Sequence, residues 1–411
     1  MMEPKGFSTK IIHSAYLKED IHHALHMPIY SNAAFEFGNA EQMENAFLGR
    51  QPDHMYSRIS NPTVENFEQK INAITGALSV TALSSGMAAI SNVFFTFAEA
   101  GDNIITSKHL FGNSFSFFNS TLRAFGVEPR FCDLTDINDI ERNIDNNTKA
   151  LFFETITNPQ LEVVDIHQLS LIARNHQLLL IADSTITPFN IFKAKDLGVN
   201  IEVISSTKII SGGATSIGGL IVDYGTFDWK AIPKLESLAH KFGPFAFNAK
   251  LRKEVFRNLG ACLSPFNAYL QSIGLETLDL RYAKASSNCI RIAEFLKQHS
   301  RVVSVNFPGL KDSPFYDISK KQFGDFPVAI LSFNLTSKEE CFEFLNRLTI
   351  IRRATNLFDN KTLIMHPAST IFCEFSKEAR HDMGVPDTLI RLSLGIEDID
   401  DLIGDINNAL N

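Results

Sequence analysis

Two residues that can do chemistry, Asp183 and Lys208, each follow a short apolar run of the length of a β-strand. Asp183 ends the run LLLIAD, and Lys208 follows the run IEVI in the stretch SSTK. If these runs are neighbouring parallel strands, the acid and the amine meet at the sheet edge where ligands bind. Such a pair suits pyridoxal phosphate (PLP), whose aldehyde needs a lysine and whose pyridine nitrogen needs a carboxylate. Taken singly, Lys208 could be a strand-end cation and Asp183 a helix N-cap.

An anion-binding element accompanies this pair. The stretch SSGMAAI, residues 84–90, follows the apolar run LSVTAL and opens a segment of helical character. Backbone N–H groups around Gly86 and Met87 would then point at a phosphate, aided by the helix dipole. The hydroxyls of Ser205 and Thr207 flank the lysine and can add hydrogen bonds. Neither GxGxxG nor the P-loop motif occurs, which disfavours a dinucleotide-dependent enzyme or a P-loop NTPase.

The elements that must position these residues are those of an α/β fold. Between about 60 and 225, helical segments such as QLSLIARNHQ alternate with six apolar runs of strand length: LSVTAL, NIITS, ALFFET, LLLIAD, IEVISS and GLIVD. This alternation predicts a mostly parallel central sheet. Amphipathic stretches such as NCIRIAEFLKQH and short strands such as VAILSFNL follow. We therefore predict an N-terminal arm (1–58), a large α/β domain (59–250) and a smaller C-terminal α+β domain (251–411).

The composition is that of a soluble globular enzyme, with 45% hydrophobic and 20% charged residues in 411. The net charge is −8 and no basic run occurs, so we expect no nucleic-acid or anionic-membrane partner. No apolar stretch reaches the roughly 18–20 residues of a membrane span, and the N-terminus lacks a secretory signal. The five cysteines form no CxxC pair, so no metal or disulfide framework is predicted. We expect a cytoplasmic protein.

Taken together, the motifs resemble the Cys/Met-metabolism PLP enzymes of fold type I, the aspartate aminotransferase-like fold. This family includes cystathionine γ-synthases, cystathionine lyases, methionine γ-lyases and O-acetylhomoserine sulfhydrylases. The resemblance covers nearly the whole chain and is carried by MYSRISNPT (55–63), SSGMAAI (84–90), ETITNP (154–159), IADST (181–185), SSTKIISGGATSIGG (205–219), LGACLSPFNAYLQSIGLETL (259–278), KTLIMHPAST (361–370) and IRLSLGIEDIDDLI (390–403). Within the family, the stretches that contain TK, LGACLSPFNA, HPAST and IRLSLGIED are most similar to O-acetylhomoserine sulfhydrylases.

The resemblance implies a role for each motif. Lys208 would bind the cofactor as a Schiff base and move protons between substrate carbons, and Asp183 would pair with the pyridine nitrogen. The residues implied to hold the phosphate are Gly86, Met87, Ser205 and Thr207. Tyr56 and Arg58 match a YSR motif that, in the family, reaches the cofactor phosphate of a neighbouring subunit. That match implies shared active sites in an obligate oligomer, usually a tetramer built as a dimer of dimers.

Further matches concern the substrate, which the resemblance implies is a small amino acid. Arg391 matches the arginine that binds its α-carboxylate, and Asn158 matches a residue near that carboxylate and the cofactor's 3-oxygen. Thr362 occupies a position where the family commonly has a substrate-facing serine. Phe111 stands where a tyrosine usually stacks on the cofactor, and Asn113 stands where methionine γ-lyases carry a cysteine. Because phenylalanine is no general acid and acetate leaves with little help, Phe111 favours an acyl-activated homoserine.

Three further departures from the family pattern are Gly213–Ala214 in place of His-Gly, Ile204 in place of histidine, and Ser184 in place of asparagine. They change the surroundings of the lysine and the carboxylate and leave both in place. We predict γ-replacement on O-acetylhomoserine by sulfide or methanethiol, which gives homocysteine or methionine plus acetate. Cystathionine γ-synthase, methionine γ-lyase and a catalytically silent PLP-binding scaffold are the alternatives. The stretch 231–248 is either a lid over the site or an interdomain connection.

Overall fold

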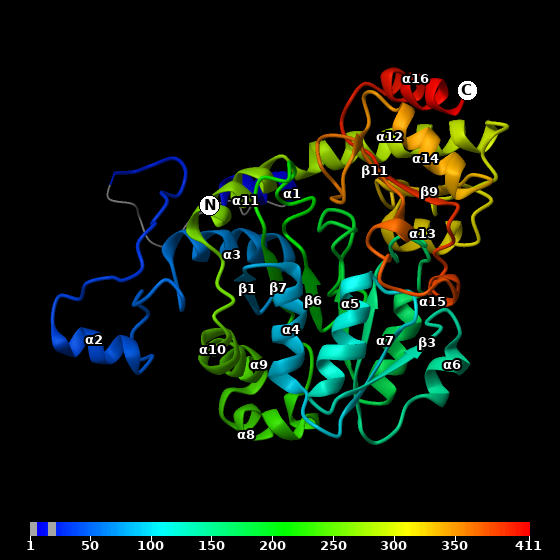
Figure 1. Cartoon of the computed structure of the whole chain (residues 1–411). Helices are drawn as coiled ribbons and strands as arrows, with labels where there is room; N and C mark the ends of the chain where they lie inside the picture. The colour runs from blue at the N-terminus through cyan, green and yellow to red at the C-terminus, as the bar shows by residue number, and fades with distance from the viewer. Residues whose placement is uncertain (1–5, 15–21) are drawn as a thin grey trace.

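The computed structural model describes residues 6–14 and 22–411. Figure 1 shows a body built around a central sheet, a second domain at its upper right, and an N-terminal arm that leaves the body on the left. The predicted α/β architecture with a smaller C-terminal α+β domain is confirmed. Within the described residues, no helix combines the length and the apolar character that a membrane-spanning segment requires.

The central sheet has seven strands in the spatial order β1-β7-β6-β5-β4-β2-β3. Their bounds are β1 Ser79–Leu83, β2 Asn103–Ser107, β3 Glu128–Cys132, β4 Thr148–Glu154, β5 Leu179–Asp183, β6 Ile201–Ile204 and β7 Gly219–Asp223. Strand β7 runs antiparallel to both neighbours, whereas all other pairs are parallel. All six apolar runs form strands here. The sequence prediction missed β3, an edge strand whose proline and charged residues break the apolar pattern.

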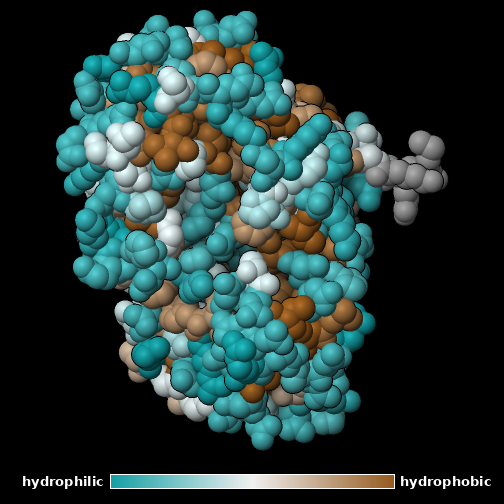
Figure 2. Space-filling view, turned by 90° about the vertical axis from the view of Figure 1, so that its right-hand side faces the viewer, coloured by the Kyte–Doolittle hydropathy of each residue, from teal (hydrophilic) through white to brown (hydrophobic). Residues whose placement is uncertain are grey.

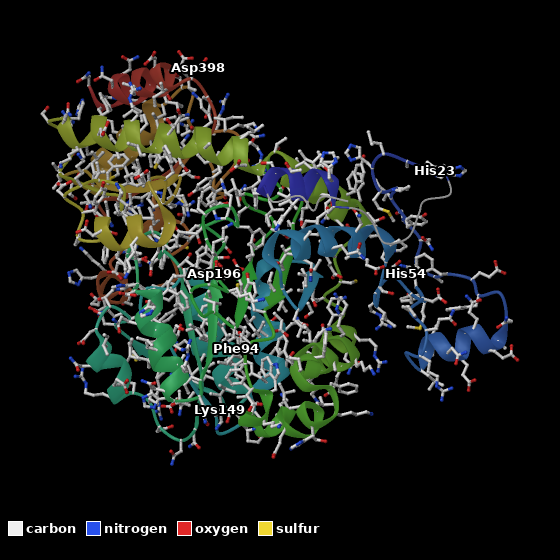
Figure 3. All side chains as sticks on the ribbon, turned by 180° about the vertical axis from the view of Figure 1, so that it is seen from behind. His23, His54, Phe94, Lys149, Asp196 and Asp398 are labelled. Atoms are coloured by element: carbon white, nitrogen blue, oxygen red, sulfur yellow. The ribbon has the colours of Figure 1, made fainter. Side chains whose placement is uncertain are left out.

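The strands read as almost continuous apolar runs because helices cover both faces of the sheet. On one face lie α4 (Gly86–Phe97), α8 (Pro233–Phe242) and α9 (Ala246–Lys250), and this core includes Phe94, labelled in Figure 3. The opposite face packs against the helices α3 (Pro62–Thr75), α7 (Ile166–Asn175) and α11 (Pro265–Glu276). The remaining elements of this part are α5 Gly112–Ser116, the π-helix Phe117–Leu122, α6 Ile137–Arg142, the 3-10 turns Trp229–Ala231 and Gly243–Phe245, the π-helix Leu251–Phe256 and α10 Arg257–Leu259.

Local sequence signals fix where the helices at the site begin. Helix α4 starts after Ser85, whose hydroxyl oxygen accepts a hydrogen bond from the N–H of Ala88 at 3.0 Å. Helix α3 starts after Asn61, with a proline at its first position, and ends at Gly76, which takes a positive φ of 61°. Both are the expected start and stop signals of a helix.

The C-terminal domain contains a five-stranded sheet in the order β10-β11-β12-β9-β8, which is antiparallel except for the β10–β11 pair. Its strands are β8 Ser304–Asn306, β9 Ile330–Asn334, β10 Arg352–Arg353, β11 Leu363–Met365 and β12 Leu389–Ser393. Its helices and turns are α12 Leu278–Gln298, α13 Tyr316–Phe323, α14 Lys338–Arg347, the 3-10 turn Pro367–Ser369, α15 Lys377–Asp382 and α16 Ile399–Leu410. The face in Figure 2 is mainly polar, with apolar residues gathered in patches.

The carboxyl ends of the central strands face the C-terminal domain. Lys149, at the start of β4, lies at the far edge of the molecule from Asp398, which precedes α16 (Figure 3). The stretch 231–248 lies below the sheet, where Leu235 and Phe247 are fully buried under α4 (Figure 1). The lid hypothesis for this stretch is therefore wrong. The same core takes up residues 251–256, which favours a domain boundary later than residue 250.

The N-terminal arm has two parts in the described residues. Helix α1 (Phe7–His13) packs on α3 and α11, and its Ile11 joins the core. Residues 22–58 run mostly without regular structure, and α2 (Ala40–Phe47) projects away from the body (Figure 1). Within the arm, Ala34 forms a bridge with Tyr56, and the arm contacts the body where the N–H of Tyr30 donates to the hydroxyl oxygen of Thr63 at 2.9 Å.

Candidate active site

A cavity of about 330 Å³ lies where the carboxyl ends of β4, β5 and β6 meet the start of α4 and the C-terminal domain. Nine of the predicted site residues line it: Gly86, Met87, Phe111, Asn158, Asp183, Ser205, Thr207, Lys208 and Arg391. The cavity walls also include isoleucines and leucine, so polar groups converge inside an apolar shell. Such a site is typical of a small-molecule pocket.

Lys208 lies four residues after β6 and reaches into this cavity. Its Nζ donates a hydrogen bond to Oδ1 of Asn356 at 2.7 Å. Asn356 lies in a loop of the C-terminal domain, between β10 and β11. Burial, with the nearby charge of Arg391, lowers the pKa of the lysine to about 8. A substantial fraction of the amine is therefore neutral near physiological pH and can act as a nucleophile or base. Asn356 carries no recognisable motif, and the sequence analysis missed it.

Asp183 ends β5 and lies in the same cavity. One of its oxygens, Oδ1, accepts hydrogen bonds from the N–H and the hydroxyl of Thr185, at 3.0 and 2.6 Å. Burial raises the pKa of Asp183, so a cationic partner inside the cavity would stabilise its ionised form. The hydroxyl oxygen of Thr185 also accepts a hydrogen bond from the N–H of Ser205 at 2.9 Å. Thr185 thereby joins the carboxylate to the segment that carries Lys208.

The start of α4 lies close against the segment before Lys208. A Cβ built on Gly86 would lie 2.7 Å from Cβ of Ser205, so only glycine allows this approach. The hydroxyl of Thr207 is held by the backbone of Gly218, donating to its carbonyl at 3.1 Å and accepting from its N–H at 3.0 Å. The helix start, its backbone N–H groups and these hydroxyls form an arrangement suited to a phosphate.

Arg391 lies on β12 and is only 2% exposed. Its guanidinium donates to Oδ1 of Asn158 at 3.3 Å and to the carbonyl oxygens of Thr355 and Asn356 at 3.2 and 3.1 Å. Burial lowers its pKa to about 10, so the group stays charged at neutral pH. Among the described residues, its Nε has no hydrogen-bond partner. A buried cation with a free donor suits a carboxylate ligand.

Phe111 immediately precedes helix α5. Its backbone N–H is bonded to Glu154, an acid that the sequence analysis did not single out. The N–H of Phe111 donates to Oε1 of Glu154 at 2.7 Å, and the N–H of Asn158 also bonds this carboxylate. Glu154 ends β4 beside Asp183 in the sheet register. Burial, with the charge of Asp183, raises the pKa of Glu154 well above its ordinary value. The motif ETITNP contains this residue and is the signal that could have found it.

The structure corrects the prediction for Thr362. Its side chain is fully buried outside the cavity, where the hydroxyl donates to Oε2 of Glu397 at 2.8 Å and accepts from the N–H of Gly395. It cannot face a substrate there. Tyr56 and Arg58 also lie outside this chain's cavity, and both are exposed. The Arg58 guanidinium lies 5.5 Å from the ring centroid of Tyr56.

The departures from the family pattern have a structural context. The hydroxyl of Ser184 points away from the cavity and donates to the buried carboxylate of Glu202. Ile204 is an apolar core residue that also lines the cavity. Ala214 has a φ of +54°, the left-handed region in which glycine is favoured, which explains why glycine is common there.

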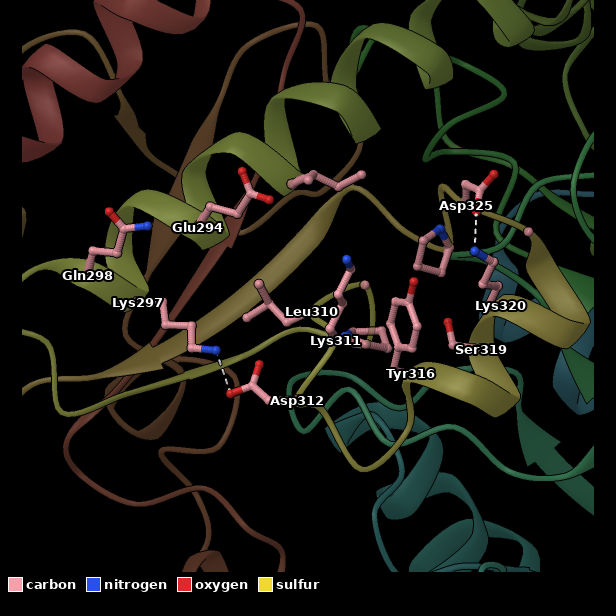
Figure 4. Close-up of a pocket in the computed structure, with 15 residues that line it drawn as sticks. Glu294, Lys297, Gln298, Leu310, Lys311, Asp312, Tyr316, Ser319, Lys320 and Asp325 are labelled. Carbon is pink, nitrogen blue, oxygen red and sulfur yellow. Dashed lines mark ion pairs between the residues drawn. The ribbon is translucent and has the colours of Figure 1, made fainter.

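A larger hollow of about 630 Å³ lies elsewhere, between α12, α13 and the loop after β8 (Figure 4). Two lysines that line it are engaged in ion pairs, Lys297 with Asp312 at 2.6 Å and Lys320 with Asp325 at 3.1 Å. None of the predicted site residues lies there. The smaller cavity is the one that combines a perturbed amine, buried acids and a buried arginine, so we regard it as the candidate active site.

The groups in the smaller cavity fit PLP. Lys208 offers an amine for the aldehyde, Asp183 a carboxylate for the pyridine nitrogen, and the start of α4 an anion site. The ring of Phe111 lines the same space, so an aromatic ring can stack between it and the opposite wall. Fold and site together define a PLP-binding enzyme of fold type I.

Comparisons with known proteins agree. Residues 8–411 match the model of the family described as Cys/Met metabolism PLP-dependent enzyme, and the chain belongs to this family. A solved O-acetylhomoserine sulfhydrylase of the methionine biosynthetic pathway of Wolinella succinogenes is 49% identical, covering 86% of this chain and 97% of that one, with a TM-score of 0.78. A putative O-acetylhomoserine (thiol)-lyase from Campylobacter jejuni, solved with N'-pyridoxyl-lysine-5'-monophosphate, is 32% identical over 99% of this chain and 100% of that one, with a TM-score of 0.94. L-methionine gamma-lyase from Fusobacterium nucleatum subsp. nucleatum is 36% identical over 100% of this chain and 99% of its own.

Proposed function

We propose that this chain catalyses γ-replacement on O-acetyl-L-homoserine, with sulfide or methanethiol as nucleophile, to give homocysteine or methionine plus acetate. The observation that carries the proposal is the cavity in which Lys208, Asp183 and Arg391 converge. The relatives support the same reaction, since the Wolinella protein is a sulfhydrylase that acts on O-acetylhomoserine. When bound, PLP supplies an electron-withdrawing ring that stabilises negative charge on the substrate carbons.

The chain's own residues bind and orient the amino acid. Arg391, with its free Nε inside the cavity, would hold the α-carboxylate, and Asn158 would steady the guanidinium through its existing hydrogen bond. Lys208 would carry the cofactor and, once released, move a proton from Cα of the substrate. Its lowered pKa suits this work near neutral pH. Its bond to Asn356 would keep Nζ aimed into the cavity during the transfer.

The roles of the remaining groups follow from their chemistry. Asp183 would keep the pyridine nitrogen protonated, and Gly86, Met87, Ser205 and Thr207 would hold the phosphate. Phe111 would stack on the ring without taking part in proton transfer, because it has no ionisable group. Acetate needs no strong acid to leave from Cγ. A phenylalanine at position 111 is therefore compatible with an acyl-activated homoserine as the substrate. Sulfide then adds at the carbon that acetate has left.

The experiment that tests this proposal compares products. The PLP-loaded protein is incubated with O-acetyl-L-homoserine, with and without sulfide, and separately with cysteine as nucleophile. We expect homocysteine and acetate in equal amounts, with homocysteine appearing only when sulfide is present. Cystathionine formation with cysteine at a comparable rate would instead indicate a cystathionine γ-synthase.

Methionine γ-elimination is the second candidate because a methionine γ-lyase is similar over the whole chain. Asn113 lines the mouth of the cavity at the position where such lyases carry a cysteine, which disfavours this activity. In the assay, L-methionine alone should release little 2-oxobutyrate. Release as fast as homocysteine synthesis would assign the chain to the lyases.

We also propose that the active form is a cytoplasmic homotetramer, a dimer of dimers with shared active sites. Tyr56 and Arg58 would bind the cofactor phosphate of a neighbouring subunit. Three features support this role: both residues are exposed, they lie outside their own cavity, and they stand at the base of a projecting arm. The five cysteines are free thiols, which suits a reducing compartment.

A further inference from the structure

Glu154 is a buried acid that the roles described so far leave unused. It ends β4, is 7% exposed and lines the cavity beside Asp183. We propose that Glu154 is a positioning residue, whose carboxylate fixes the backbone of Phe111 and Asn158 and thereby sets the stacking ring against the cofactor. This inference rests on the stacking role that the proposed function gives to Phe111.

The carboxylate connects two segments that are far apart in the sequence. Its Oε1 accepts from the N–H of Phe111 at 2.7 Å, and the N–H of Asn158 donates to the same group. Phe111 precedes α5, where a Cβ on Gly112 would lie 2.9 Å from the carbonyl oxygen of Ile371. The loop that bears the ring is therefore confined on one side by the C-terminal domain and tied on the other by Glu154.

The second bond extends the same effect toward the substrate. Asn158 accepts a hydrogen bond from Arg391 at 3.3 Å through its side chain, while its backbone N–H is held by Glu154. One carboxylate thus sets the position of the aromatic ring over the cofactor and of the amide that contacts the arginine. A change at Glu154 would shift both, while the groups proposed to bind the cofactor and the substrate all remain present.

The chemistry of the side chain explains why an acid occupies this position. A carboxylate has two acceptor oxygens and can receive two N–H groups that arrive from different segments. A glutamine has only one such oxygen, and its NH₂ group would face the second N–H. Burying a second carboxylate beside Asp183 costs free energy. A residue that only held the loop in place would not need a charged group, so the acid indicates a role in the site.

The test is a double-mutant cycle read by cofactor affinity and not by turnover. Apo protein is titrated with PLP and followed by visible absorbance and circular dichroism, for the parent chain, Glu154→Gln, Phe111→Ala and the double variant. Loss of one buried hydrogen bond should raise the PLP dissociation constant about 10-fold in Glu154→Gln. In the Phe111→Ala background, where no ring remains to be positioned, the same change should raise it less than about 3-fold.

Controls separate positioning from folding. Glu162→Gln is the matched control, because Glu162 bonds His109 at 2.7 Å, two residues before Phe111, but does not line the cavity. It should leave PLP affinity unchanged. If Glu154→Gln fails to fold, Glu154→Asp takes its place in the cycle, since it keeps two acceptors but withdraws them by one methylene. An unchanged dissociation constant, or equal weakening with and without the Phe111 ring, overturns the proposal. A parent chain that binds PLP but has no turnover would contradict the proposed function alone.

Discussion

Glu202 gives a prediction that can be worked out in numbers. It lies on β6 with no exposed surface, where it accepts hydrogen bonds from Ser184 and, at 2.5 Å, from the hydroxyl of Tyr224. Burial raises its pKa from an ordinary 4.5 to about 7, although these two hydrogen bonds act in the opposite direction. Between pH 4.5 and about 7 the folded chain therefore keeps a proton that the unfolded chain has released.

The sign and the size follow from linkage. Because the folded state binds the extra proton, the contribution of Glu202 to stability is complete below pH 4.5 and is lost as the pH rises through about 7. At about 1.4 kcal/mol for each tenfold change in proton affinity, the loss is ~3 kcal/mol. Glu202→Gln removes this titration while it keeps the shape and one acceptor of the side chain. The variant should therefore gain stability relative to the parent chain as the pH rises.

The assay is equilibrium unfolding in urea at several pH values between 5 and 8, at one protein concentration because the chain is proposed to be an oligomer. Asp223 also has a pKa raised to about 7 by burial, so only the difference between variant and parent isolates Glu202. Glu374→Gln, a change at an exposed glutamate, serves as the control and should show no such difference. A stability difference between Glu202→Gln and the parent that stays constant over this pH range would refute the reasoning.

Three further predictions concern the site. Arg391→Lys should lower kcat/KM for O-acetylhomoserine roughly 100-fold, mainly through KM, because lysine cannot bind a carboxylate bidentately. An unchanged KM in steady-state kinetics would contradict the role of Arg391 in binding the α-carboxylate. Phe111→Tyr should leave turnover of O-acetylhomoserine within about 3-fold, since acetate needs little help from an acid, and a many-fold rise in rate would show that this argument is wrong. Co-expression of Lys208→Ala with Arg58→Ala, each inactive alone, should yield mixed oligomers with restored activity; purified mixed oligomers without activity would argue against shared sites.

The sequence pattern predicted most of the strands of the large domain but not every residue of the site. Apolar runs predicted the inner strands because both faces of that sheet are buried, and the same logic brought Asp183 and Lys208 toward one edge. Strand β3 was missed because an edge position tolerates Pro129 and charged residues. Periodic patterns describe regular elements, and therefore say little about irregular loops.

Thr362 and Asn356 illustrate that limit. Both belong to the segment between β10 and β11, in which side-chain direction depends on contacts with distant residues. Thr362 turns toward Glu397, whereas Asn356, six residues earlier, reaches Lys208 across the domain boundary. Neither contact leaves a local signal in the sequence. Glu154 lay inside a recognised motif, but its hydrogen bonds to Phe111 and Asn158 became visible only in three dimensions.

The most direct test of the central claim is a visible absorbance spectrum of the purified protein with PLP, followed in the same cuvette by addition of O-acetyl-L-homoserine and then of sulfide. We predict a visible band of lysine-bound cofactor that is absent in Lys208→Ala, a shift of that band on addition of substrate, and homocysteine only with sulfide. A spectrum without any visible band after addition of PLP would contradict the account, because Lys208 would then be an ordinary cation at the end of a strand.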